Sequence, residues 1–145
     1  FNHGAGNRNR VLEARKFSLL TAFALGIVVS LALAFGISYV AVLFLSKDAP
    51  AYSIAAHGVP LMAIGFTLSI VNVAAIGYYQ SVERALPATI FSLSRGVIFL
   101  VPCFLVIPLF AGVNGIWLAL PATEALTFLS IVSFSLFRKR QTVKR

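Results

Sequence analysis

The chain has 145 residues, of which 59% are hydrophobic and 11% are charged, and its formal net charge is +8. A soluble domain needs charged outer faces on its helices, and this composition cannot supply them. The charge would suit nucleic acid, but the cations gather at the two chain ends, beside apolar segments. We therefore expect a membrane protein with flanking basic residues and no nucleic-acid partner.

Residues 1–16 are polar and basic, and we expect a cytoplasmic loop followed by an amphipathic lead-in. The glycines Gly4 and Gly6 suit a sharp turn before Val11. Because Phe1 is not preceded by Met, we expect it to be an interior position of a longer protein.

Four long apolar stretches follow, at residues 17–45, 52–79, 85–110 and 113–137. About 20 apolar residues in a helix suffice to cross a hydrocarbon core about 30 Å thick. The stretches lack the alternation and the short length of outer-membrane strands, and lipid offers no partner for free backbone groups. The sequence predicts an all-α polytopic membrane protein with four transmembrane helices.

Lysine and arginine predict the orientation of these spans. Basic residues precede the first span and fill the tail at 138–145, whereas the joints at 46–51 and 111–114 carry little or no net charge. An excess of Lys and Arg marks the cytoplasmic side. We therefore expect a multi-pass protein of the cell inner (plasma) membrane, with both ends of this chain cytoplasmic.

No constellation for catalysis or metal binding is present. The chain has one cysteine, two histidines and four acids, without the HExxH, GxSxG or CxxC patterns. We expect no enzyme activity, no catalytic residues, no metal and no organic cofactor.

Two ionisable residues lie inside apolar stretches, Arg95 in the third and Glu124 in the fourth. Counted along each helix at 1.5 Å per residue, Arg95 lies about 12 Å and Glu124 about 14 Å from the inner face. Antiparallel neighbours would bring the two side chains level. The pair can serve as a register-fixing contact, or it can line a transport cavity where one member meets protons or a charged substrate.

The second stretch has polar residues but no acid. Asn72 and Ser69 are three residues apart, so they share one helix face. We include both as candidate transport-cavity residues with Arg95 and Glu124. Interhelical hydrogen bonding explains them equally well.

Several motifs resemble the multidrug and toxic compound extrusion (MATE) transporters. The opening residues 1–11 are similar to the family's NYGAGN…RV segment after its eighth helix, with His3 where Tyr is common. Further similar motifs lie in the later helices, namely Tyr79-Gln80-Ser81, Ser94-Arg95, and Gly115-Ile116-Trp117-Leu118-Ala119 with Pro121 and Glu124. The resemblance implies the last third of a twelve-helix fold, whose other helices include an N-terminal lobe as this chain's partner.

The resemblance also implies a function: an antiporter that exports organic cations across the lipid bilayer in exchange for protons or sodium, by rocking of two six-helix lobes. In one respect the chain departs from the pattern. Some sodium-coupled members carry an acid in the helix corresponding to residues 52–79, where this chain offers only polar groups such as Asn72.

Two other classes of protein fit the residues alone. One is a self-contained four-helix small multidrug carrier that works as an oligomer. The other is a non-transporting membrane scaffold, or a flippase relative that handles lipid-linked glycans. Eight further spans encoded upstream would favour the MATE interpretation.

Overall fold

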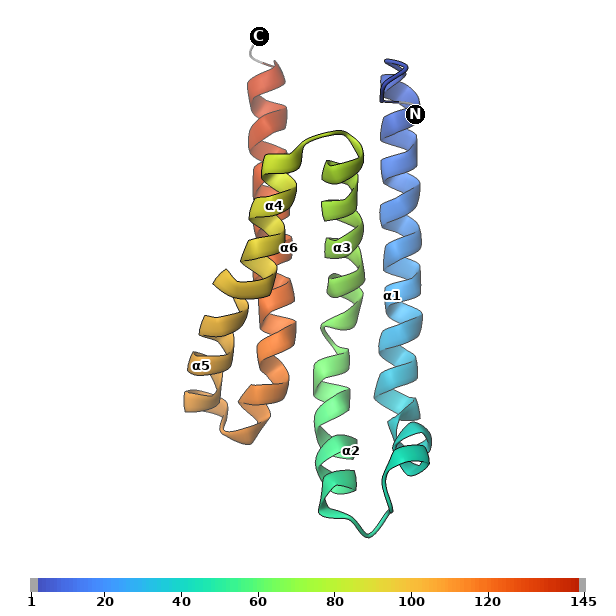
Figure 1. Cartoon of the computed structure of the whole chain (residues 1–145), viewed down its shortest axis with the longest axis vertical. Coiled ribbons are helices and arrows are strands. Elements are labelled where there is room, and N and C mark those ends of the chain that lie inside the picture. The colour runs from blue at the N-terminus through green and yellow to red at the C-terminus, as the bar shows by residue number, and fades with distance from the viewer. Residues whose placement is uncertain (1–2, 144–145) are drawn as a thin grey trace.

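A computed structural model describes residues 3–143 of the chain (Figure 1). Phe1, Asn2, Lys144 and Arg145, at the ends of the predicted loop and basic tail, lie outside the described residues. Within the described part, every regular element is a helix. In chain order these are α1 (Arg8–Phe44), α2 (Pro50–Ala63), α3 (Phe66–Ser81), α4 (Ala85–Leu93), the π-helical turn η1 (Ser94–Ile98), α5 (Leu100–Ala111) and α6 (Val113–Val143).

The predicted all-α polytopic membrane fold is confirmed. Three helical segments, Arg8–Phe44, Ala85–Ala111 and Val113–Arg138, are long and apolar enough to span a membrane, and the bent pair α2 and α3 makes a fourth if it counts as one span. Large apolar side chains such as Phe35, Tyr39 and Phe44 point outward, as lipid contact requires.

The first helix includes the predicted lead-in. A turn over residues 3–6 ends at Gly6, whose φ of +71° is easily reached only by glycine. Asn7 then caps the helix by accepting a hydrogen bond from the Arg10 backbone N–H. No proline interrupts the chain between Arg8 and Pro50, so lead-in and span form one helix of 37 residues.

The second apolar stretch is broken, where we expected one span over residues 52–79. The axes of α2 and α3 differ by 50°, and the break lies at Ile64 and Gly65. Pro60 removes one backbone donor just before the break, and glycine is a weak helix former. Gly65 also lies against α6, because a Cβ placed on it would come within 2.7 Å of the Pro121 Cα.

The third stretch is interrupted by the π turn η1. The Phe99 N–H donates to the Ser94 carbonyl across five residues, at 2.8 Å. Pro102 lacks the N–H that would bond the Ile98 carbonyl, so the regular ladder stops at this point. As a result α4 packs on α3, whereas α5 turns away from α3 and packs on α6 (Figure 1).

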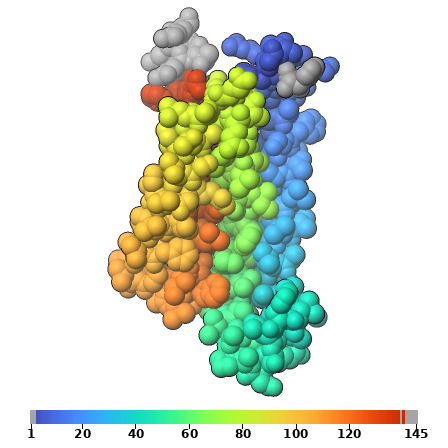
Figure 2. All heavy atoms as spheres, viewed as in Figure 1, coloured from blue at the N-terminus to red at the C-terminus, as the bar shows by residue number. Residues whose placement is uncertain are grey.

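The two ends of the described chain and the α3–α4 turn lie at one end of the bundle, and the α1–α2 and α5–α6 turns lie toward the other (Figure 1). We call the first the terminal end. The α1–α2 turn protrudes beyond the α5–α6 turn (Figure 2). This up-and-down course matches four spans, while the cytoplasmic placement of the terminal end stays a prediction. The predicted tail is helical as far as it is described, because nothing after Pro121 breaks α6.

Candidate functional site

Three elements bring the four predicted site residues together near the middle of the bundle. Ser69 and Asn72 come from α3, Arg95 from η1 and Glu124 from α6. The predicted contact between the two charged residues is confirmed, because Arg95 Nη2 lies 2.7 Å from Glu124 Oε1. Arg95 Nε also donates to both carboxylate oxygens, at 2.8 and 3.1 Å. The guanidinium therefore binds the carboxylate through two nitrogens, and such charge-assisted hydrogen bonds are strong.

The α3 residues complete the group, which we call the central cluster. Asn72 Nδ2 donates to Glu124 Oε2 at 2.8 Å and to the Glu124 backbone carbonyl at 2.9 Å. Arg95 Nη2 donates to Ser69 Oγ at 2.7 Å. Each charged side chain thus has one charged partner and one polar partner from α3.

Burial divides the central cluster into a closed side and an open side. Glu124 is 1% exposed and Asn72 is fully buried, whereas the Arg95 side chain keeps 33% of its surface exposed. Asn72 Oδ1 is buried and accepts no hydrogen bond from the described residues, although buried amide oxygens nearly always have a partner. The cluster therefore has one accessible cation and one unused acceptor beside its carboxylate.

Arg95 is the second residue of the π turn η1. A π turn inserts one extra residue into the helical repeat and so rotates the following side chains relative to an unbroken helix. Such turns are frequent at functional sites. Sequence reasoning identified Arg95 by its charge but not the π turn that positions it, although Pro102 was an available signal.

Sequence reasoning also missed two buried threonines on α6. Thr123 and Thr127 are fully buried, and their hydroxyls donate to carbonyls four residues earlier, those of Ala119 and Thr123. Their spacing of four residues places both on one face of α6, next to Glu124. Because both hydroxyls donate to carbonyls of their own helix, the two threonines do not compete for the hydrogen bonds of the central cluster.

A second contact group lies nearer the terminal end, and we call it the aromatic cluster. The rings of Tyr79, Phe91 and Phe134 pack with centroid separations between 5.5 and 6.0 Å. The Tyr79 hydroxyl shares a hydrogen bond of 3.0 Å with Ser135 Oγ. The aromatic cluster holds α3, α4 and α6 together through the close packing of its rings.

The central cluster holds one carboxylate and one guanidinium as an ion pair. Its carboxylate is held by Arg95 and Asn72, both of which can release it without breaking a covalent bond. Among residues 3–143, no three His, Cys, Asp or Glu side chains are grouped closely enough to hold a metal ion. The transport roles of Ser69, Asn72, Arg95 and Glu124 stay predictions.

Comparison with known proteins identifies the family. The family model MatE matches residues 1–106, which include three members of the central cluster but not Glu124. A search of curated proteins and a search of solved structures each gave no match. The family match covers more than half of the chain and agrees with its apolar helices. This chain therefore belongs to the MatE family and is a MATE-type membrane transporter.

Proposed function

We propose that this chain is the carboxy-terminal part of a twelve-helix antiporter that exports organic cations in exchange for protons or sodium. The family match supports a transporter rather than a scaffold. The central cluster supports a coupled one, because ionisable residues within membrane spans are costly and generally serve transport. Its partners in this proposal are the lipid bilayer, the organic cation and the remaining helices of the transporter, including its N-terminal lobe.

Glu124 is the observation that carries the proposal. Its carboxylate is almost fully buried in a bundle of membrane spans, and polar partners from two other elements hold it. If the Arg95–Glu124 pair only fixed the register between two helices, neither side chain would need to be exposed. Here one-third of the Arg95 side chain is exposed, on a side that the described helices of this chain leave uncovered.

Electrostatics then suggests how export and import are coupled. With Glu124 ionised, the pair has no net charge. A coupling cation that joins the carboxylate displaces Arg95, and the cluster then carries one net positive charge. A positive charge in a site of low dielectric constant repels an organic cation nearby, which favours its release. Loss of the coupling ion restores the pair and allows the next substrate to bind.

The residues present suit a proton better than sodium, although both remain in the proposal. A proton needs only one carboxylate oxygen. Sodium needs several oxygen ligands, and the cluster could offer Asn72 Oδ1, Ser69 Oγ and the carboxylate. Arg95 lies 2.7 Å from that carboxylate and would repel a metal cation until it moved away.

Export of ethidium from cells that express the complete transporter tests the proposal. Glu124→Gln removes the exchangeable charge at nearly constant volume, so we expect export to fall to background while the protein remains in the membrane. Glu83→Gln, in the exposed α3–α4 turn, is the matched control and should export normally. A proton ionophore should stop export if protons are coupled, and removal of sodium should stop it if sodium is coupled. Normal export by Glu124→Gln would refute the coupling role.

The membrane orientation needs its own test. In a background of Cys103→Ala, a cysteine at Asn9 should be protected from an impermeant thiol reagent in intact cells, and one at Asp48 should react. We expect this pattern because basic residues gather at the terminal end. Labelling at Asn9 from outside would reverse the proposed orientation.

A further inference from the structure

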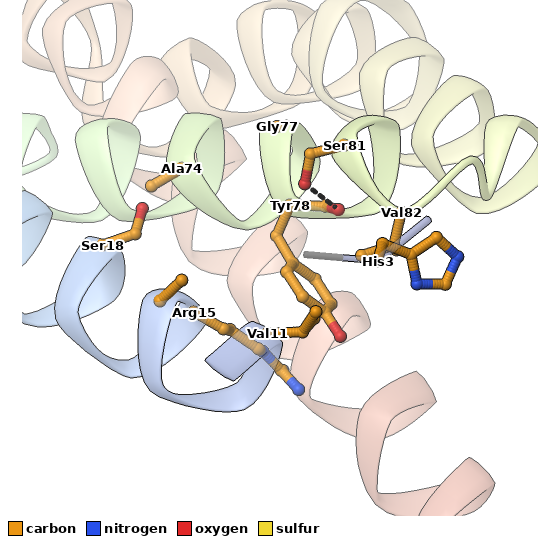
Figure 3. Close-up of a pocket in the computed structure, with 10 residues that line it drawn as sticks. His3, Val11, Arg15, Ser18, Ala74, Gly77, Tyr78, Ser81 and Val82 are labelled. Carbon is orange, nitrogen blue, oxygen red and sulfur yellow. Dashed lines mark hydrogen bonds between the residues drawn. The ribbon is translucent and has the colours of Figure 1, made fainter. Parts of the chain in front are cut away.

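Two adjoining pockets lie at the terminal end, between the start of α1 and the α3–α4 turn. Their volumes are about 410 and 430 Å³, and both are lined by His3, Val11, Tyr78 and Val82. Figure 3 shows the first pocket, with the Arg15 side chain beside the Tyr78 ring. Because the two pockets share these residues, we treat them as one basic pocket.

Three arginines line the basic pocket. Arg15 lines one part, and Arg8 and Arg84 line the other. The Arg15 guanidinium carbon lies 4.8 Å from the centre of the Tyr78 ring, a cation–π contact that holds the side chain in place. None of the three arginines forms an ion pair with the described residues, and no acid lines the pocket. The basic pocket is therefore suited to an anion.

Local backbone structure places two of these arginines. The turn that ends at Gly6 and the Asn7 cap put Arg8 in the first turn of α1, at the positive end of the helix dipole. Beyond α3, Glu83 takes a φ of +58°, and the Arg84 N–H closes back on the Tyr79 carbonyl at 2.9 Å. This Schellman-type ending turns Arg84 back toward α1.

We propose that the basic pocket binds the phosphate headgroup of an anionic phospholipid. Guanidinium groups match the geometry of phosphate oxygens, and basic pockets at helix ends in membrane proteins suit anionic headgroups. The pocket lies where membrane spans reach their polar ends. Arg15 also lines an apolar groove of about 310 Å³, with Leu19, Val71, Phe128 and Ile131. An acyl chain in that groove would begin beside the phosphate, and a free phosphate ion would leave it empty.

Native mass spectrometry of the purified protein tests this, with phosphatidylglycerol and phosphatidylcholine as probes. Replacing Arg8, Arg15 and Arg84 by Gln should lower phosphatidylglycerol retention about tenfold. The matched control replaces Arg10, Lys16 and Lys47 by Gln, which removes equal charge outside the basic pocket. It should change retention less than about twofold, because diffuse surface attraction is weak. Equal losses in both triple variants would overturn the site.

A second variant closes the basic pocket and leaves every charge in place. Gly77 lines the pocket, and a Cβ there meets no atom within 4 Å, so Gly77→Leu should fold and fill the space. Gly36→Leu is its control, because Gly36 has equal room but lies in α1 away from the pocket. Only Gly77→Leu should lose phosphatidylglycerol. Unchanged retention in Gly77→Leu, or displacement of the lipid by inorganic phosphate at millimolar concentration, would contradict the proposal.

Discussion

The central cluster and the aromatic cluster join nearly the same helices by different means. Both connect α3 to α6 and to the start of the third span, at Arg95 or at Phe91. The rings of the aromatic cluster contact one another by packing, so truncating one ring leaves the other two in contact. In the central cluster every member supplies a partner that another member needs. Helix contacts between similar elements can therefore tolerate gradual loss where they rest on packing, but tolerate the loss of a charge poorly where they rest on an ion pair.

The membrane environment increases the difference between the two clusters. Lipid tails are as apolar as Leu or Phe, so burying rings between helices gains mainly tight packing. An unpaired charge, in contrast, finds no water in the bilayer core. We therefore expect the largest effects from removing a single charge of the central cluster, and the following four predictions test that ranking.

Removing one charge should have the largest effect. Arg95→Leu leaves Glu124 buried without its cation, and Glu124→Leu leaves Arg95 unpaired, at a cost of about 3 kcal/mol or more in each case. The double change Arg95→Leu with Glu124→Leu should be much milder, because no charge is stranded. Unfolding in mixed micelles and the membrane-inserted yield measure all three variants.

The double variant also separates the two interpretations of the pair. Recovery of yield without recovery of ethidium export would mean that the pair acts in transport. Recovery of both yield and ethidium export would mean that the pair only fixes the register between helices. Single variants that match the wild type in yield and export would contradict any need for the pair.

Truncating a ring should have the next largest effect. Phe91 is buried and touches both Tyr79 and Phe134, so Phe91→Ala opens a cavity in the aromatic cluster. We expect a loss of about 2 kcal/mol, below the range for soluble cores because lipid exposure carries little penalty. Phe104→Ala, which removes an exposed ring from α5, is the matched control for unfolding. A loss larger than that of Arg95→Leu would reverse the ranking.

Asn72→Leu should weaken the central cluster without stranding a charge. Glu124 Oε2 loses the Asn72 donor but keeps Arg95 Nε at 3.1 Å. Removal of the unpaired Asn72 Oδ1 offsets part of the loss, so we expect about 1 kcal/mol in the same unfolding measurement. Asn114→Leu, which breaks an exposed hydrogen bond to His57, is the control. A loss as large as that of Glu124→Leu would show that Asn72 carries more of the cluster than its contacts suggest.

Tyr79→Phe should have the smallest effect. It removes only the hydrogen bond to Ser135 and keeps the ring contacts of the aromatic cluster. Interhelical hydrogen bonds in membranes contribute about 0.6 kcal/mol on average, and the Ser135 hydroxyl can turn to a carbonyl of its own helix. Tyr79→Ala should cost clearly more, because it also removes the ring. Equal losses for the two variants would mean that the hydroxyl, not the ring, supports this cluster.

Residue chemistry and periodicity alone predicted a large part of this molecule. Long apolar stretches indicated membrane helices, and the rarity of charge within them identified Arg95 and Glu124. Helix geometry made the two residues level, and their observed contact agrees with that estimate. Asn72 and Ser69 followed from sharing one face of α3. These inferences succeeded because the rise of a helix and the cost of a buried charge depend little on the surrounding fold.

The orientation of those residues, and the way in which the broken spans pack, depend on tertiary contacts. At the bend that follows Pro60, Gly65 lies against Pro121, from a helix more than fifty residues away in the sequence. Packing between helices also determines two sets of partners. Asn72 donates to Glu124, and Arg95, in the π turn, donates to Ser69. Local sequence fixes which residues must find partners in the membrane. Which partner each one takes depends on contacts between distant segments, which no local pattern records.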